Sequence, residues 1–132
     1  MNSPDRLDGC RPLAAVLDTD RLANLVALED GEDPQFLTGL ITLFLSETPK
    51  RLAEIAAAQA AGDGPMLARV AHTLKGACAT LGADELQELS ASLEACASRN
   101  ELAKLAPTLS ALDGAFARLE EALRLQQRRL QL

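Results

Sequence analysis

The sequence predicts an all-α protein, an up-down antiparallel four-helix bundle with a short additional N-terminal helix. Of the 132 residues, 48% are hydrophobic but only 2% are aromatic, so the core must consist mainly of leucine and alanine, the residues of packed helices. Leucines recur at intervals of three and four along four long segments. Short stretches rich in glycine, proline and aspartate separate these segments, and short connections favour antiparallel neighbours.

The N-terminal region is expected to contribute little to the bundle. Residues 1–17 show weak periodicity and contain two prolines, and we interpret them as a flexible arm. Asp18 or Thr19 can cap a short helix that reaches about Leu28. Residues 29–33, EDGED, then form a turn.

The first long helix is expected from Pro34 to about Ala61. Asp33 can cap it, and Pro34 suits a first helical position, where no N–H is needed. Pro49 lies inside this segment, and because the apolar pattern resumes in phase beyond it, we expect a kink and not an end. The apolar positions are Phe36, Leu37, Leu40, Ile41, Phe44, Leu45, Leu52, Ile55 and Ala56.

Two shorter helices are expected next. The segment 65–81 follows the break GDGP and stops at Gly82, which suits the left-handed position after a helix end. Asp84 is expected to cap the following helix, with Gln87 three residues later. The buried stripe of that helix is Leu86, Leu89, Leu93 and Cys96.

The last long helix is expected after a turn at residues 98–100. Leucine and phenylalanine recur from Leu102 to Leu123 with regular spacing, and Pro107 can kink or restart this helix. The expected organisation is one bundle, residues 18–125, followed by a C-terminal tail, residues 126–132.

Charge and composition exclude several function classes. The formal net charge of −6 argues against nucleic acid as a partner, because binding phosphates needs a basic face. No apolar run approaches the roughly 18 residues of a membrane span, and the N-terminus has no signal pattern, so we expect no membrane association and a cytoplasmic location. Cys10, Cys78 and Cys96 form no CxxC pair, so no disulfide framework is expected. Nucleotide-binding loops of the GxxxxGK[ST] or GxGxxG type are absent from the sequence.

The only histidine, His72, is predicted to face away from the core. On a helical wheel of the segment 65–81, the large apolar side chains gather within about 50° of the opposite pole. They are Leu67, Val70, Leu74, Ala77 and Leu81. The nearest neighbours of His72 are small or basic: Ala68, Lys75, Gly76 and Ala79, with Arg69 at the edge. An outward imidazole without bulky neighbours is an accessible nucleophile at cellular pH.

Gly76 and Lys75 favour chemistry at His72. A glycine inside a helix costs about 1 kcal/mol relative to alanine, and space for the ring or for a docking group would explain it. Close packing of two helices is the alternative. Lys75 can reach the space above the imidazole and partly neutralise an anion there, or it is an ordinary solvated lysine. A phosphoryl group is the natural anion for such a site.

The stretch HTLKGACATLG, residues 72–82, closely resembles the signature of histidine-containing phosphotransfer (HPt) domains. That signature is a histidine, any residue, an apolar residue, lysine, glycine, small residues and a later glycine. The segment 36–52, FLTGLITLFLSETPKRL, is similar to the helix that precedes the signature in this family, and the resemblance covers about residues 18–125.

The resemblance implies a phosphoryl carrier of a two-component phosphorelay, and not an enzyme. His72 would be the phosphorylated residue, Lys75 the charge beside the phosphoryl group, and Gly76 the gap that gives access. Many members have a glutamine where this chain has Glu94. Glu94 could accept a hydrogen bond from the ring and orient the imidazole, or it could simply face solvent.

The resemblance also implies partners. Response-regulator receiver domains and a sensor (hybrid) histidine kinase would be the partners of a monomeric carrier that binds no cofactor itself. Mg²⁺ is expected on the partner receiver domain during transfer. The docking face would surround His72. The residues expected there are Ala68, Arg69 and Ala79, and also Leu28, Phe36 and Leu40, whose more ordinary role would be in the core.

Other function classes were weighed against the carrier. A helical adaptor without chemistry explains the leucine stripes equally well but leaves the outward His72 and Gly76 as coincidences. A structural zinc site at His72, Cys78 and Cys96 would need four converging ligands, and Cys78 lies about 120° around the helix from His72. A hydrolase would need a serine or cysteine beside the histidine, and none can be placed there.

Overall fold

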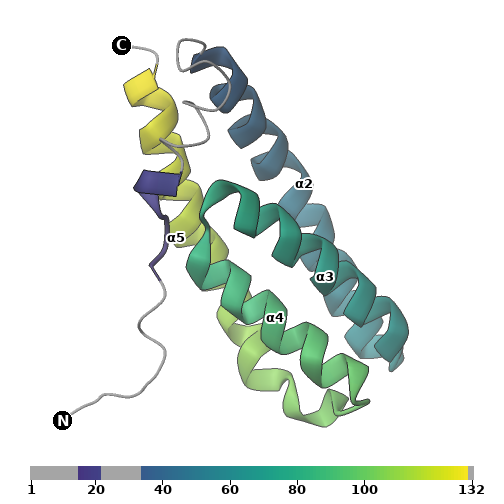
Figure 1. Ribbon diagram of the computed structural model, residues 1–132. Helices are drawn as coiled ribbons and strands as arrows, with labels where there is room; N and C mark the ends of the chain where they lie inside the picture. Colours follow the sequence, from purple (N-terminus) through teal and green to yellow (C-terminus); the bar gives the residue numbers. More distant parts are fainter. Residues whose placement is uncertain (1–14, 22–33, 131–132) are drawn as a thin grey trace, which may run out of the picture.

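Four long helices run alternately up and down in the computed structural model, which describes residues 15–21 and 34–130 (Figure 1). They are α2 (Pro34–Ala61), α3 (Gly64–Leu81), α4 (Asp84–Ser98) and α5 (Ala106–Leu130). A 3₁₀ turn, η2 (Leu102–Lys104), precedes α5, and residues 19–21 are helical as well. The predicted all-α class and four-helix architecture are confirmed, while Asp33 and the expected continuation of the short helix to Leu28 lie outside the described residues.

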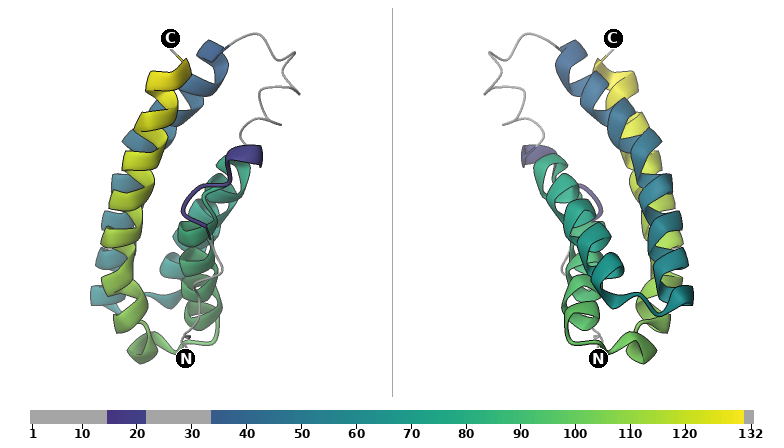
Figure 2. Two further views of the ribbon diagram at one scale, coloured as in Figure 1. Left: turned by 90° about the vertical axis from the view of Figure 1, so that its left-hand side faces the viewer. Right: turned by 90° about the vertical axis from the view of Figure 1, so that its right-hand side faces the viewer.

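The helices form two pairs of unequal length. Figure 2 shows α2 and α5 as a long pair, with the shorter α3–α4 hairpin packed against one end of it. The other end of the long pair projects past the turn that joins α3 to α4. Helix α3 packs against α4 and against α2, which leaves the remaining side of α3 to solvent.

The core is aliphatic, as the composition predicted. Its largest fully buried apolar side chains come from every helix and are Ile41, Ile55, Leu67, Leu74, Leu86, Leu93, Leu105, Leu119 and Leu123. Some expected core positions are wrong: Ala77 of α3 is exposed, and so are Phe36 and Ala56 of α2, while Leu89 and Cys96 of α4 are only partly buried. The buried side of α3 is turned toward α4, so Ala71 and Cys78 are fully buried instead.

Asp63 and Gly82 lie at the two ends of α3. The Asp63 carboxylate accepts a hydrogen bond from the Met66 N–H at 3.1 Å and so caps α3. Gly82 ends α3 in the left-handed region, with φ of 77°. The expected cap at Asp84 is wrong, because Ala83 holds that position and makes no side-chain cap bond.

Residues 15–21 attach to the turn between α3 and α4. The Asp18 N–H donates to the Gly82 carbonyl at 2.7 Å, and the Glu85 N–H donates to the Ala15 carbonyl at 2.8 Å. Arg21 donates a hydrogen bond to the carboxylate of Asp84 at 3.0 Å. A Cβ at Gly82 would lie 2.9 Å from the Asp18 carbonyl oxygen, so this turn has room only for glycine.

Two expected boundaries differ from the structure. Of residues 15–17, which we expected in the flexible arm, Ala15 accepts the hydrogen bond from Glu85, and Val16 and Leu17 pack against the core. Helix α5 continues past the expected end of the bundle at Leu125, and the Gln127 amide donates to the Thr38 carbonyl and the Thr42 hydroxyl of α2. This contact fixes the end of α5 to the start of α2.

Pro49 lies inside α2, which does not end there, as expected. The Thr48 hydroxyl donates to the Phe44 carbonyl at 2.7 Å just before this proline. Pro107 lies in the first turn of α5, so the chain restarts there after η2. Within the described ranges, every helix is too short or too polar to span a lipid bilayer.

Candidate functional site

His72 lies on the solvent side of α3, where its side chain is 67% exposed. The residues that anchor this part of the helix, Ala71 and Leu74, are buried on the opposite side. The predicted outward orientation of the only histidine is confirmed. The imidazole is therefore accessible from outside while its backbone is held by the core.

Glu94 of α4 contacts both polar side chains of the site. Its Oε2 lies 2.8 Å from Nδ1 of His72, and its Oε1 lies 2.6 Å from Nζ of Lys75. The Glu94 side chain is only 25% exposed. The alternative that Glu94 merely faces solvent is wrong, because one carboxylate links the lysine and the histidine of the signature.

The charge of Glu94 determines which ring nitrogen of His72 is free. The hydrogen bond from Lys75 is the main cause that lowers the pKa of Glu94, and the bond with His72 lowers it further. The carboxylate is therefore ionised at neutral pH and can only accept hydrogen bonds. Nδ1 of His72 must then carry the proton and donate, so Nε2 of the neutral ring holds the lone pair. The described residues offer no hydrogen-bond partner to Nε2, which is the atom available to an electrophile.

Gly76 lies one turn beyond His72 and is exposed. A Cβ built on it would meet no other atom within 4 Å. The alternative of close helix–helix packing at this glycine is therefore wrong, and a methyl group would not touch the His72 ring either. Within the described part of the chain nothing requires a glycine here.

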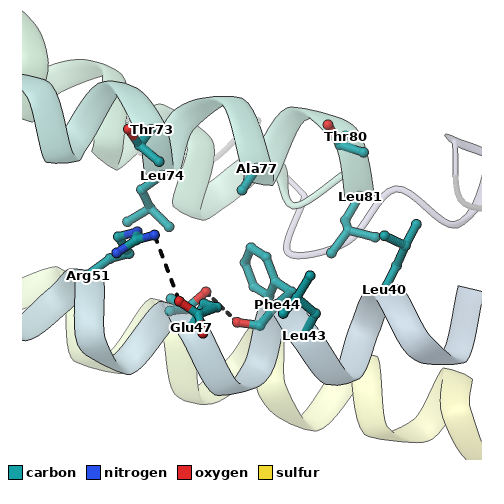
Figure 3. Close-up of a pocket in the computed structure, with 11 residues that line it drawn as sticks. Leu40, Leu43, Phe44, Glu47, Arg51, Thr73, Leu74, Ala77, Thr80 and Leu81 are labelled. Atoms are coloured by element: carbon teal, nitrogen blue, oxygen red, sulfur yellow. Dashed lines mark hydrogen bonds and ion pairs between the residues drawn. The ribbon is translucent and has the colours of Figure 1, made fainter.

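A groove of about 270 Å³ runs between α2 and α3 beside this face (Figure 3). Phe44 rises from α2 toward Ala77, Leu74 extends from α3 toward Arg51, and Thr73 and Thr80 lie along the α3 side. The expected docking residue Leu40 lines it. Leu43 also lines the groove and is 58% exposed. It was not predicted, although a leucine outside the core stripe of α2 was a signal for it.

Of the remaining predicted docking residues, those in the described part of the chain do not line the groove. Ala68 is partly buried against the core, and Ala79 is partly buried with its carbonyl accepting from Arg21 at 3.3 Å. Arg69 is exposed and lies against the Met66 sulfur at 3.0 Å. Phe36 is 36% exposed but does not line the groove. Leu28 lies outside the described residues.

The cysteines do not join His72 in a metal site. Cys78 is fully buried, and burial raises its pKa to about 12, so its thiol is not readily deprotonated for metal binding. In residues 15–21 and 34–130, no three histidine, cysteine or acidic side chains come together as metal ligands would. The geometry gives no support to a metal centre at His72, Cys78 and Cys96.

Comparisons with known proteins agree with this geometry. The family model of the Hpt domain matches residues 39–127. The crystal structure of histidine-containing phosphotransfer protein B (HptB) from Pseudomonas aeruginosa PAO1 is similar with a TM-score of 0.78 and 30% identity, covering 88% of this chain and 97% of that chain.

A second solved structure supports the fold alone. The HPT domain of the Hpt sensor hybrid histidine kinase from Shewanella has a TM-score of 0.71 and 18% identity, with 86% of this chain and 95% of that chain covered. The comparison with curated proteins found no match. The match of the family model, together with the 30% identity to HptB over most of both chains, shows that this chain belongs to the Hpt domain family, whose members are phosphoryl carriers, and that its role lies in a two-component phosphorelay.

Proposed function

We propose that the protein carries a phosphoryl group on Nε2 of His72 between aspartates of receiver domains. The observation that supports this most directly is the orientation of the ring. Glu94 occupies Nδ1, and the unprotonated Nε2 is left on an exposed side chain. A neutral imidazole in this tautomer is a nucleophile that needs no further activation.

The neighbours of His72 have separate roles in this proposal. The Nε2 lone pair attacks the phosphorus of a receiver aspartyl phosphate in line, and Lys75 supplies positive charge beside the transferred group. Gly76 leaves open space for the approaching receiver, which accounts for a glycine that no intramolecular contact requires. Glu94 orients the ring.

The partner supplies the other parts of the chemistry. HPt domains exchange phosphoryl groups with hybrid sensor kinases and receiver domains, and we propose both as partners of this chain. Mg²⁺ on the receiver would neutralise charge during transfer, and no nucleotide would bind here. We place the carrier in the cytoplasm and as a monomer. The two cysteines in the described part of the chain, Cys78 and Cys96, are free thiols, as is usual in that reducing compartment.

The groove between α2 and α3 is the proposed docking surface. It is mainly apolar, and Thr73 links it to the exposed face that carries His72 and Gly76. Leu43 is exposed on its α2 side although it is a large apolar residue. Burial of such a side chain against an apolar part of the receiver would contribute affinity without affecting the bundle.

The test is phosphotransfer from a receiver domain that carries a labelled aspartyl phosphate. We expect label to pass to the wild-type protein and not to His72→Gln, while circular dichroism shows that both variants are folded. Equal labelling of the two proteins would contradict the assignment of His72 as the phosphorylated residue. Binding of the receiver without any transfer would instead favour the adaptor hypothesis.

The docking surface needs a separate test, with Leu43→Ala. Because Leu43 is mostly exposed, its truncation should leave stability within about 0.5 kcal/mol of wild type. The rate of transfer at subsaturating carrier should fall several-fold, while the rate at saturation stays unchanged. If instead the transfer rate falls only at saturating concentrations of the carrier, Leu43 does not act in docking.

A further inference from the structure

The feature that calls for explanation is the charge of Glu94. An amide would accept the hydrogen bond from Nδ1 and orient the ring equally well, but it would add no negative charge beside the imidazole. The carboxylate lies 2.8 Å from Nδ1 and is held in place from its other oxygen by Lys75. Orientation alone does not require this arrangement.

We infer that Glu94 is a positioning residue that keeps the Nδ1 proton on the His72 ring throughout phosphoryl transfer, so that the phosphorylated ring remains a cation and a competent donor. This inference rests on the proposed function, because it concerns the same histidine. It assigns to the carboxylate a role in the release of the phosphoryl group as well as in its capture.

The chemistry balances without any movement of a proton. On arrival, the Nε2 lone pair forms the N–P bond, the P–O bond of the aspartyl phosphate breaks, and its electron pair goes to the receiver carboxylate. The ring changes from neutral to positively charged while Nδ1–H stays in place. On departure, the N–P pair returns to Nε2 and neutral imidazole is the leaving group. Without the Nδ1 proton the leaving group would be an imidazolate, which is far more basic and leaves slowly.

The geometry suits this role and reduces repulsion between the two anions. The carboxylate lies at the Nδ1 edge of the ring, and the phosphoryl group would be attached at Nε2, across the ring from it. Lys75, which binds Oε1 of Glu94, offsets part of the carboxylate charge. The negative charge of Glu94 therefore mainly stabilises the proton on Nδ1 of His72 and repels the phosphoryl group less.

Charged groups on neighbouring elements do not replace Glu94. On α3, Arg69 lies against the sulfur of Met66. On α2, Arg51 and Glu54 line a shallow pocket with Arg69, and they pair with each other at 3.4 Å. In the described part of the chain, Glu94 of α4 is the only carboxylate in contact with the ring.

The experiment compares wild type, Glu94→Gln and a matched control, Glu88→Gln. Glu88 is an exposed glutamate on the same helix, so its replacement removes the same charge from α4 away from the site. Each protein is phosphorylated with phosphoramidate, and the transfer of label to an unphosphorylated receiver is followed from about pH 6 to about pH 8.5, an interval that spans the titration range of imidazole.

Wild type and Glu88→Gln should keep their transfer rates as the pH rises. Glu94→Gln should transfer at a similar rate near pH 6 and about tenfold more slowly near pH 8.5, because each pH unit above the pKa of the phosphorylated ring lowers its protonated fraction about tenfold. In ¹⁵N spectra of the phosphorylated ring, the Nδ1–H signal should be lost at lower pH in Glu94→Gln than in wild type. Each receiver is used at a single concentration across all proteins, so its own pH dependence cancels in the ratio.

The outcomes separate this inference from the proposed function. If phosphoramidate labels wild type and the three proteins show parallel pH profiles, Glu94 only orients the ring and the inference is wrong. If His72 of wild type takes no label, the proposed carrier function itself fails. A uniform loss of transfer in Glu94→Gln at every pH would likewise contradict the inference, since it would indicate misplacement of the ring.

Discussion

The two sides of α3 differ in what they contact. The inner side is packed into the bundle, where Leu67, Leu74 and Cys78 are fully buried. The outer side carries His72 with an exposed ring and Gly76 with open space above it. The inner side therefore determines stability, and the outer side is free to meet a partner, so changes on the two sides should have separable effects.

The largest effect on stability is expected from the inner side, with Leu67→Ala. Leu67 is fully buried and does not line the groove, so its truncation should lower the free energy of unfolding by about 2–5 kcal/mol. Urea denaturation measures this loss. The fraction that remains folded should still accept phosphate on His72, and a folded but inactive variant would contradict the separation of the two sides.

A smaller loss is expected at the end of the helix, with Gly82→Ala. The residue has a φ of 77°, and its new Cβ would lie 2.9 Å from the Asp18 carbonyl oxygen. The strain should cost at least about 1–2 kcal/mol in urea denaturation. Hydrogen exchange should also show weakened protection of the Asp18 N–H, which donates to the Gly82 carbonyl. Unchanged stability would show that the turn tolerates a side chain.

On the outer side, Gly76→Ala should move stability and transfer in opposite directions. Nothing in the described structure opposes the new methyl group, so better helix propensity should stabilise the protein by up to about 1 kcal/mol. Transfer from a receiver should fall at least several-fold, because the methyl group occupies the approach to His72. Thermal denaturation and a transfer assay measure the two effects.

Gly114→Ala is the matched control for this substitution. Gly114 is an exposed helical glycine of α5, and an added Cβ would make only an ordinary contact of 3.5 Å with the Arg118 side chain. It should gain stability in the same way and leave transfer unchanged. Equal transfer by Gly76→Ala and Gly114→Ala would remove the proposed reason for the glycine in the signature.

The smallest effect is the pH dependence of stability due to Glu94. Its pKa is lower in the folded protein, chiefly through the hydrogen bond from Lys75. A lowered folded-state pKa stabilises the protein above the ordinary pKa of glutamate, and this contribution is lost as pH falls through the folded-state pKa. Wild type should therefore be slightly more stable than Glu94→Gln at about pH 7, and the difference should vanish once the pH falls below the folded-state pKa of Glu94. If wild type remains more stable than Glu94→Gln at acidic pH, the difference in stability arises from packing and not from the charge of Glu94.

Local patterns predicted the fold well, since long leucine periodicity fixes which side of each helix is buried. Pro34, Pro107 and Gly82 lie where their backbone preferences indicated. The exposure of Ala77 was missed because a small side chain says little about how far α3 is rotated between its neighbours. Asp84 did not cap α4, because the helix begins at Asp84 itself and Ala83 holds the cap position. The Asp84 carboxylate instead binds Arg21, a contact distant in sequence.

The same distinction between local patterns and contacts distant in sequence applies to the candidate site. The outward direction of His72 follows from helical spacing within one segment. The contact of Glu94 with His72 and Lys75 depends on the register between α3 and α4, which spacing along the chain does not determine. The groove beside Leu43 is formed by the packing of α2 against α3. Because spacing along the chain does not determine this packing either, the groove could be recognised only in the three-dimensional structure.

The most direct measurement of the carrier role is to locate the phosphoryl group after transfer from a phosphorylated receiver domain. Heteronuclear NMR of the ¹⁵N-labelled histidine ring distinguishes the two nitrogens and identifies the one bonded to phosphorus. We expect the phosphoryl group on Nε2 of His72, with the proton retained on Nδ1. A phosphoryl group on Nδ1, or on any other residue of the chain, would contradict the role that the geometry of His72 and Glu94 supports.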